Sequence, residues 1–133
     1  MQTKYILIPE GNRYRLISQV EIPGVCKPGD RGGLVESEHN LGQEGNCWVT
    51  ENAMVLGQAR VSDNALILQN AIVQHKARVF DNAVIFGDAR VEMWARVFEN
   101  AHVGGTATLK GNISVFGDRK LNAVLPSKFK SRK

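Results

Sequence analysis

The chain has 133 residues and a formal net charge of +4, a size that suits a single domain. Six basic side chains and no acid follow residue 118, whereas the first 118 residues carry eleven basic and thirteen acidic side chains. The excess of positive charge therefore comes from a basic tail. It is no evidence for a nucleic-acid-binding surface on the body of the protein.

The cysteines and the apolar runs exclude further classes. Cys26 and Cys47 are too few for a disulfide framework or a zinc site, and we expect no bound metal. No apolar run approaches the roughly eighteen residues of a membrane-spanning helix. Residues 1–12 lack the features of a signal peptide. We therefore expect a cytoplasmic protein with no membrane partner.

The N-terminal residues predict a hairpin. Residues 3–9 and 13–20 each have the composition of a strand, and Glu10, Gly11 and Asn12 form a turn between them. The ends of a stacked fold leave unpaired backbone edges that need a cover. We expect residues 1–31 to be a β cap for one end of the fold.

From Asn52 to Gly117 the sequence repeats every six residues, from NAMVLG to NISVFG. The second position is Ala in ten consecutive hexads and Ile113 in the last, and the fourth is Val, Ile or Leu in all eleven. An apolar period of two indicates a strand with one buried face. The Gly, Asn and Asp residues between these pairs are typical of tight corners.

Equal strands joined by equal corners predict a triangular coil with three hexads per turn. Residues eighteen apart would then lie above one another, with about 4.8 Å between successive coils. The predicted fold is all-β: a single-stranded parallel β-helix of about four to five triangular coils over residues 32–118. A C-terminal segment and basic tail would follow at 119–133.

These hexads carry a resemblance to a known family. An aliphatic residue followed four positions later by a small one, as in Val55 to Ala59 and Val61 to Ala65, resembles the hexapeptide-repeat left-handed β-helix proteins. The resemblance implies the left hand. Residues 29–49, GDRGGLVESEHNLGQEGNCWV, are more closely similar to uncharacterised bacterial and phage-encoded proteins of this class.

The resemblance implies two kinds of function. The class includes trimeric acyltransferases that use acetyl-CoA or similar donors, with a histidine base at a cleft between subunits, and it also includes non-catalytic homologues. This chain has no insertion between residues 46 and 117, and the glycine of the usual enzyme hexad is displaced by one position. Both departures favour a non-catalytic protein.

Stacking by eighteen sorts the outward residues into columns. One face collects apolar side chains, namely Trp48, Leu66, Leu68, Val84 and Phe86. Exposed apolar patches usually mark contact surfaces. We expect this patch to be the interface of a homo-oligomer, a trimer or a dimer. The alternative is that the N-terminal strands fold over it.

A second face combines Arg60, Arg78 and Arg96 with Phe80 and Phe98. The neighbouring corner supplies Asp63, Asp81 and Glu99, so one interpretation is a column of charges that neutralise each other. The other interpretation is an anion site, because arginines beside aromatic rings suit phosphates and bases. Its ligand could be a nucleotide, a CoA diphosphate or a nucleic-acid backbone.

His102 and His75 are the candidates for a catalytic base near neutral pH, and His102 is the better placed for a cleft between subunits. Three hypotheses follow. The first is a non-catalytic, homo-oligomeric binding protein, without a cofactor, that takes a protein partner or a small anionic ligand. The resemblance to phage-encoded proteins implies for it a role as a phage-borne accessory or host-interaction factor. The alternatives are an acyl-CoA-dependent acyltransferase and a nucleic-acid-binding protein that uses the basic tail and the Arg/Phe face.

Overall fold

The structure is a computed structural model that describes residues 3–121. The rest of the predicted C-terminal segment and basic tail lies outside the described residues. The N-terminal elements are β1 (Tyr5–Glu10), β2 (Arg13–Ser18), β3 (Arg31–Val35) and the 3₁₀ turn η1 (Glu38–Asn40). The strands of the repeat are β4 (Trp48–Val49), β5 (Met54–Val55), β6 (Arg60–Val61), β7 (Leu66–Ile67), β8 (Ile72–Val73), β9 (Arg78–Val79), β10 (Val84–Ile85), β11 (Arg90–Val91), β12 (Arg96–Val97), β13 (His102–Val103), β14 (Thr108–Leu109), β15 (Ser114–Val115) and β16 (Lys120–Leu121).

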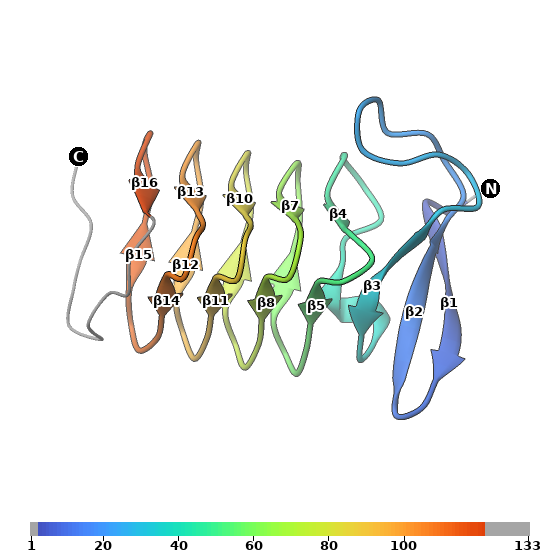
Figure 1. Cartoon of the computed structure of the whole chain (residues 1–133), viewed down its shortest axis with the longest axis horizontal. Helices are drawn as coiled ribbons and strands as arrows, with labels where there is room; N and C mark the ends of the chain where they lie inside the picture. The colour runs from blue at the N-terminus through green and yellow to red at the C-terminus, as the bar shows by residue number, and fades with distance from the viewer. Residues whose placement is uncertain (1–2, 122–133) are drawn as a thin grey trace.

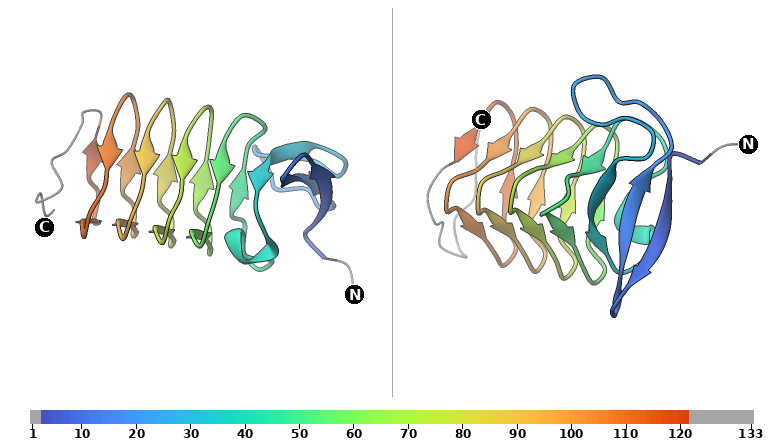
Figure 2. Two further views of the ribbon diagram at one scale, coloured as in Figure 1. Left: turned by 90° about the horizontal axis from the view of Figure 1, so that it is seen from below. Right: turned by 45° about the vertical axis from the view of Figure 1, so that its right-hand side comes forward.

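The repeat forms a solenoid of about five turns with three parallel sheets (Figures 1 and 2). The sheets have the orders β3-β5-β8-β11-β14, β16-β13-β10-β7-β4 and β15-β12-β9-β6, the first of them extended by β2 and β1. Along the regular coils each strand pairs with the strand eighteen residues away, as in Val84 with Leu66 and with His102. The predicted all-β fold and its eighteen-residue register are confirmed. The coils continue through Leu121, past the predicted boundary at residue 118.

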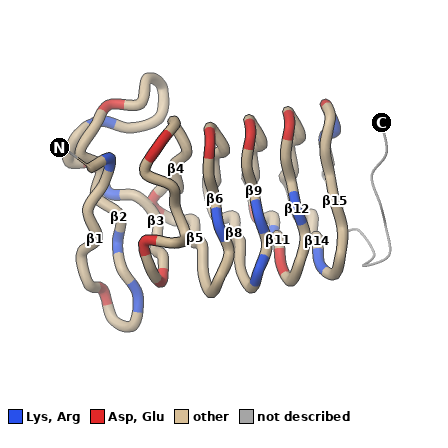
Figure 3. The backbone as a smooth tube through the Cα atoms, turned by 180° about the vertical axis from the view of Figure 1, so that it is seen from behind, with Lys and Arg blue, Asp and Glu red and all other residues tan. Residues whose placement is uncertain are grey.

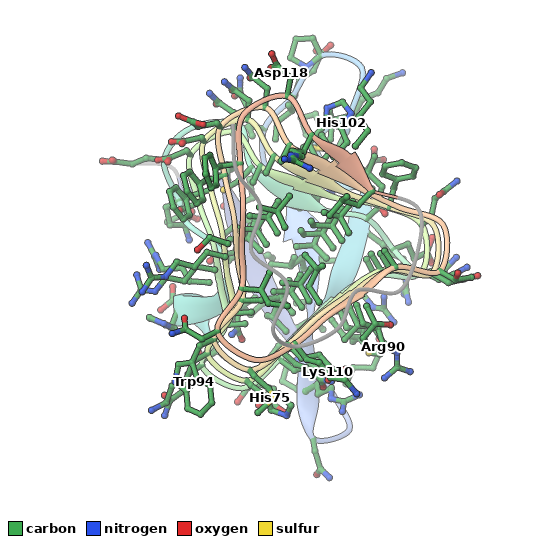
Figure 4. All side chains as sticks on the ribbon, turned by 90° about the vertical axis from the view of Figure 1, so that its left-hand side faces the viewer. His75, Arg90, Trp94, His102, Lys110 and Asp118 are labelled. Carbon is green, nitrogen blue, oxygen red and sulfur yellow. The ribbon has the colours of Figure 1, made fainter. Side chains whose placement is uncertain are left out.

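The coil is left-handed. Figure 4 looks along the axis with the C-terminal coils nearest the viewer. From Arg90 to Trp94 the chain moves clockwise to the next corner while it advances toward the viewer, which is the sense of a left-handed helix.

The core is a column of small and branched side chains. Each alanine at the second hexad position and each aliphatic residue at the fourth is fully buried, including Ala83 and Ile85 in the middle of the solenoid. Such alternation places one side chain inward and the next outward along every strand. The outward positions are left to carry the surface chemistry.

The corners need a left-handed backbone, and the sequence places several residues other than glycine there. Asp63, His75, Asp81, Met93 and Glu99 all have φ between 57° and 64°. This conformation is unfavourable for a residue with a Cβ. Side chains of the preceding coil compensate by accepting from the corner amides: Asp63 Oδ2 from Asp81 N at 3.1 Å, and Asp81 Oδ2 from Glu99 N at 3.0 Å.

The N-terminal strands close one end of the solenoid, as predicted. β1 and β2 form an antiparallel hairpin, β2 pairs with β3, and β3 also pairs in parallel with β5 of the first full coil. Because β3 belongs to both parts, the hairpin continues the sheet and protects its edge. Figure 2 shows the hairpin against the first coils.

Asn40, at the end of η1, joins the irregular segment before the repeat to the first regular coil. Its fully buried side chain accepts from the amides of Glu36 (2.8 Å) and Ser37 (2.9 Å). It donates to the carbonyls of Gly57 (3.1 Å) and Ala59 (2.8 Å). In the regular coils such carbonyls accept from a backbone amide, as in the bond from Arg60 N to Ala77 O. The Asn40 amide therefore replaces backbone donors that the irregular segment does not supply.

Tyr5 makes the stability of the protein depend on pH in the alkaline range. Burial, together with the negative charge of Glu38, raises the pKa of Tyr5 to about 12, and its hydroxyl donates to Leu41 O. Because the folded state holds this proton more tightly than the unfolded state, the stabilisation is complete below pH about 10 and falls as pH rises toward 12. Urea unfolding between pH 8 and 11.5 should show a steeper alkaline loss for the native protein than for Tyr5→Phe. Equal slopes would contradict this assignment.

Candidate ligand-binding face

Three consecutive strands of the β6-β9-β12-β15 sheet begin with an arginine. Arg60 pairs in register with Arg78, and Arg78 with Arg96, so the three side chains form one column on the outer face. Arg78 and Arg96 are exposed and Arg60 is half-buried. Figure 3 shows the basic positions on β6, β9 and β12 with acidic residues at the corners above them. We call this sheet surface the arginine face.

The corner acids form no ion pair with this column. Within residues 3–121, the ion pairs of arginine with a carboxylate within 4.0 Å involve other arginines and other acids. They join Arg15 and Arg31 to Glu10, Arg31 to Glu51, and Arg90 to Glu92. The corner acids instead accept hydrogen bonds from backbone amides of the next coil. The last of these bonds runs from Gly117 N to Glu99 Oε1 at 2.8 Å. The corner carboxylates therefore form no direct ion pairs with the arginines, and the hydrogen bonds that they accept come from the corner backbone.

Arg60 differs from the other two arginines. Its Nη1 donates to the carbonyl oxygen of His39 at 2.8 Å, which fixes the guanidinium beside the irregular segment. The side chains of Arg78 and Arg96 form no hydrogen bond or ion pair with any residue of the described range 3–121. The face thus has one fixed cation and two cations without an internal partner.

A phenylalanine column runs beside the arginines, as the register predicts. The rings of Phe80 and Phe98 are parallel to within 1°, with centroids 5.1 Å apart. Phe98 and Phe116 lie 5.3 Å apart at 15°. The three half-buried rings therefore form one continuous stack along the solenoid axis, a favourable arrangement for aromatic side chains.

Two hollows flank the arginine column. One, of about 460 Å³, is lined by Arg60, Ser62, Asp63, Arg78, Phe80 and Arg96. The other, of about 550 Å³, lies toward the opposite corner and is lined by His39, Gln58, Lys76, Arg78, Trp94 and Arg96. Arg78 and Arg96 line both, so they are the residues that an anion on either side would contact.

Trp94 is the residue of this region that the sequence interpretation missed. Its side chain is 53% exposed at the corner before β12, where Figure 4 labels it. The available signal was local: the pair Met93 and Trp94 stands where other corners of this edge carry Gly57-Gln58 and Gly111-Asn112. A large apolar pair at an outward corner is unusual and marks the position.

The two histidine candidates lie apart from the arginines. His75 is at a corner, and its Nδ1 accepts from the backbone amide of Met93 at 3.1 Å. In the neutral ring, an accepting Nδ1 leaves the proton on Nε2, so neither nitrogen has a free lone pair for a base. His102 is half-buried on another face of the prism, in register with Val84 and Lys120 (Figure 4).

The predicted apolar patch is smaller than expected. Trp48 is only 1% exposed, because the cap lies against it: a Cβ added at Gly32 would be 2.6 Å from Trp48 Cζ2. Trp48 keeps the outward register position opposite Leu66, but its side chain is covered, so the alternative of an N-terminal cover holds there. Leu66 packs against the core. Leu68, Val84 and Phe86 remain half-buried on this face.

Neither a metal centre nor a membrane-spanning helix is found in residues 3–121: no group of three potential metal ligands occurs there, and no helix is long and apolar enough to cross a bilayer. Comparison with protein-family models gives no match. A search of curated proteins also finds no similar sequence.

Proposed function

We propose that the chain is a non-catalytic, homo-oligomeric β-helix that binds an anionic ligand on the arginine face. One observation carries this proposal: Arg78 and Arg96 are exposed and stacked in register, and their side chains have no hydrogen-bond or ion-pair partner among residues 3–121. Adjacent coils are about 4.8 Å apart, so neighbouring guanidinium groups repel each other. A bound anion relieves this repulsion and adds charge-assisted hydrogen bonds.

The oligomer is the second part of the proposal. Leu68, Val84 and Phe86 lie on a face of the prism other than the arginine face, so subunit contact there would leave the arginines accessible. Native mass measurement of the protein purified from its own host reports the number of subunits and any retained ligand. A monomer at micromolar concentration would remove the homo-oligomer from the proposal.

The binding test is calorimetric titration with inorganic phosphate. We expect Arg78→Gln and Arg96→Gln each to weaken binding about tenfold, since a hydrogen bond to a charged group contributes about 1.5–3 kcal/mol. Arg90→Gln is the matched control, because Arg90 begins a strand of the neighbouring sheet and pairs with Glu92. The control should bind phosphate like the native protein.

Two results would replace the proposal. Turnover of acetyl-CoA that is lost in His102→Ala would favour the acyltransferase. Binding of single-stranded DNA that is lost on removal of residues 122–133, but kept in Arg78→Gln, would favour a nucleic-acid-binding tail.

A further inference from the structure

The phenylalanine column ends abruptly at Phe80. The next residue of the same column, one coil toward the N-terminus, is Ser62. It precedes Phe80 by eighteen residues and follows directly on the paired residues Val61 and Val79. Below Ser62 lies Gly42: its amide donates to Val61 O at 2.9 Å, and a Cβ built on it would be 3.7 Å from Ser62 Cα. A serine and a glycine therefore occupy two places where the column would otherwise carry rings.

One face of the Phe80 ring consequently borders a hollow. Phe98 covers the other face at 5.1 Å with nearly parallel planes. The space on the Ser62 side is the hollow of about 460 Å³ that Phe80, Ser62 and the three arginines line. We call it the stacking notch. Its position suits one more planar ring at the spacing that the column already has.

The charged side chains that line the stacking notch favour an anion. Arg60 is held by the His39 carbonyl, and its Nη2 lies 3.7 Å from a Cβ built on Gly42, so this guanidinium borders the notch at its N-terminal end. Arg78 is exposed on the next coil and lines the same hollow. Asp63 is the acid of this lining, and its Oδ2 already accepts from Asp81 N. The lining therefore has three arginines and one carboxylate, which already accepts a hydrogen bond.

We infer that the stacking notch binds a planar aromatic ring that carries an anionic group, such as an aryl carboxylate or the base and phosphate of a nucleotide. The ring continues the phenylalanine stack over Ser62 and Gly42, and the anion contacts Arg60 and Arg78. This inference rests on the proposed function and narrows its ligand. Stacking between a planar ring and an aromatic side chain supplies selectivity for shape, while the arginines supply selectivity for charge.

The first test compares ligands that differ in one feature, by calorimetric titration of the full chain. Phenyl phosphate and cyclohexyl phosphate have the same charge and nearly the same size, but only the first is planar and aromatic. We expect phenyl phosphate to bind about tenfold more tightly than cyclohexyl phosphate, the range that aromatic stacking contributes. Benzoate and adenosine monophosphate are titrated in parallel. They distinguish an aryl carboxylate from a nucleotide as the source of the ring and the anionic group.

The second test fills the stacking notch. Ser62→Phe places a fourth ring in the column, so it should abolish the preference for phenyl phosphate while inorganic phosphate still binds at Arg78 and Arg96. Gln74→Phe is the matched control, since Gln74 holds the same hexad position on another face of the same coil. Should Ser62→Phe fail to fold, Phe80→Leu removes the stacking surface instead and should also abolish the preference.

The outcomes separate the two proposals. Equal affinity for phenyl and cyclohexyl phosphate, or a preference that survives both Ser62→Phe and Phe80→Leu, overturns the stacking notch and leaves phosphate binding on the arginine face intact. No binding of any of these anions overturns the proposed function itself.

Discussion

Asn40→Ala should lower the free energy of unfolding by about 3–5 kcal/mol, because it leaves the buried Ala59 carbonyl without a partner, which costs about 1–3 kcal/mol, and removes three partly buried hydrogen bonds of about 0.5–1.5 kcal/mol each. The groups that lose a bond are the amides of Glu36 and Ser37 and the carbonyls of Gly57 and Ala59. Asn40→Asp should be similarly harmful, since it sets a carboxylate oxygen against the two carbonyls. A loss of this size is a large part of the stability of a small domain.

Urea denaturation followed by circular dichroism measures this loss. Asn82→Ala is the control: Asn82 is exposed, and its amide bonds to Asn64 and Asn100 in the ladder along one corner. Surface changes of this kind usually stay within about 0.5 kcal/mol. If Asn40→Ala and Asn82→Ala lost the same stability, the buried amide would not be what joins the first coil to the cap.

Gly33→Ala should cost more than about 3 kcal/mol, because the added methyl group has no room and its neighbours are mainly backbone. A Cβ at Gly33 would lie 2.5 Å from Val49 Cγ1 and 2.7 Å from Thr50 O, and closer still to Ala53 O. Gly33 stands in β3, the strand shared by the cap and the first coil. The substitution should therefore push the hairpin away from the solenoid and expose Trp48.

Tryptophan fluorescence and thermal unfolding report these effects together. Gly42→Ala is the matched control, since the nearest atoms to its added Cβ are at 3.7 Å, an ordinary contact distance. We expect Gly42→Ala to unfold close to the native midpoint. A native midpoint for Gly33→Ala would mean that β3 does not pack against the first coil as described.

The sequence allowed the solenoid to be predicted because its six-residue period determines two things at once. Alternation within a hexad decides which side chains face inward, and three hexads per turn decide which residues stack. The pairing of Val84 with Leu66 and of Arg60 with Arg78 follows directly. The phenylalanine stack was predictable for the same reason.

Hydrogen bonds between coils and the irregular segment could not be predicted in this way. Asp63 and Asp81 could have reached either the arginines or the corner amides, and periodicity does not decide between these partners. Asn40 and Gly42 lie in the segment before the repeat, where stacking by eighteen does not hold, so the buried amide and the stacking notch were not foreseen. The burial of Trp48 was not predictable because its cover includes Gly32, which lies outside the hexads.

The most direct test of the central claim, that the arginine face binds anions, is a spectrum of the arginine side chains. The Nε–H signals of ¹⁵N-labelled protein are followed while inorganic phosphate is added. We predict that the signals of Arg78 and Arg96 shift with saturation, whereas that of Arg90, paired with Glu92, stays in place. Signals of Arg78 and Arg96 that do not move, or equal shifts at every arginine, would contradict the account.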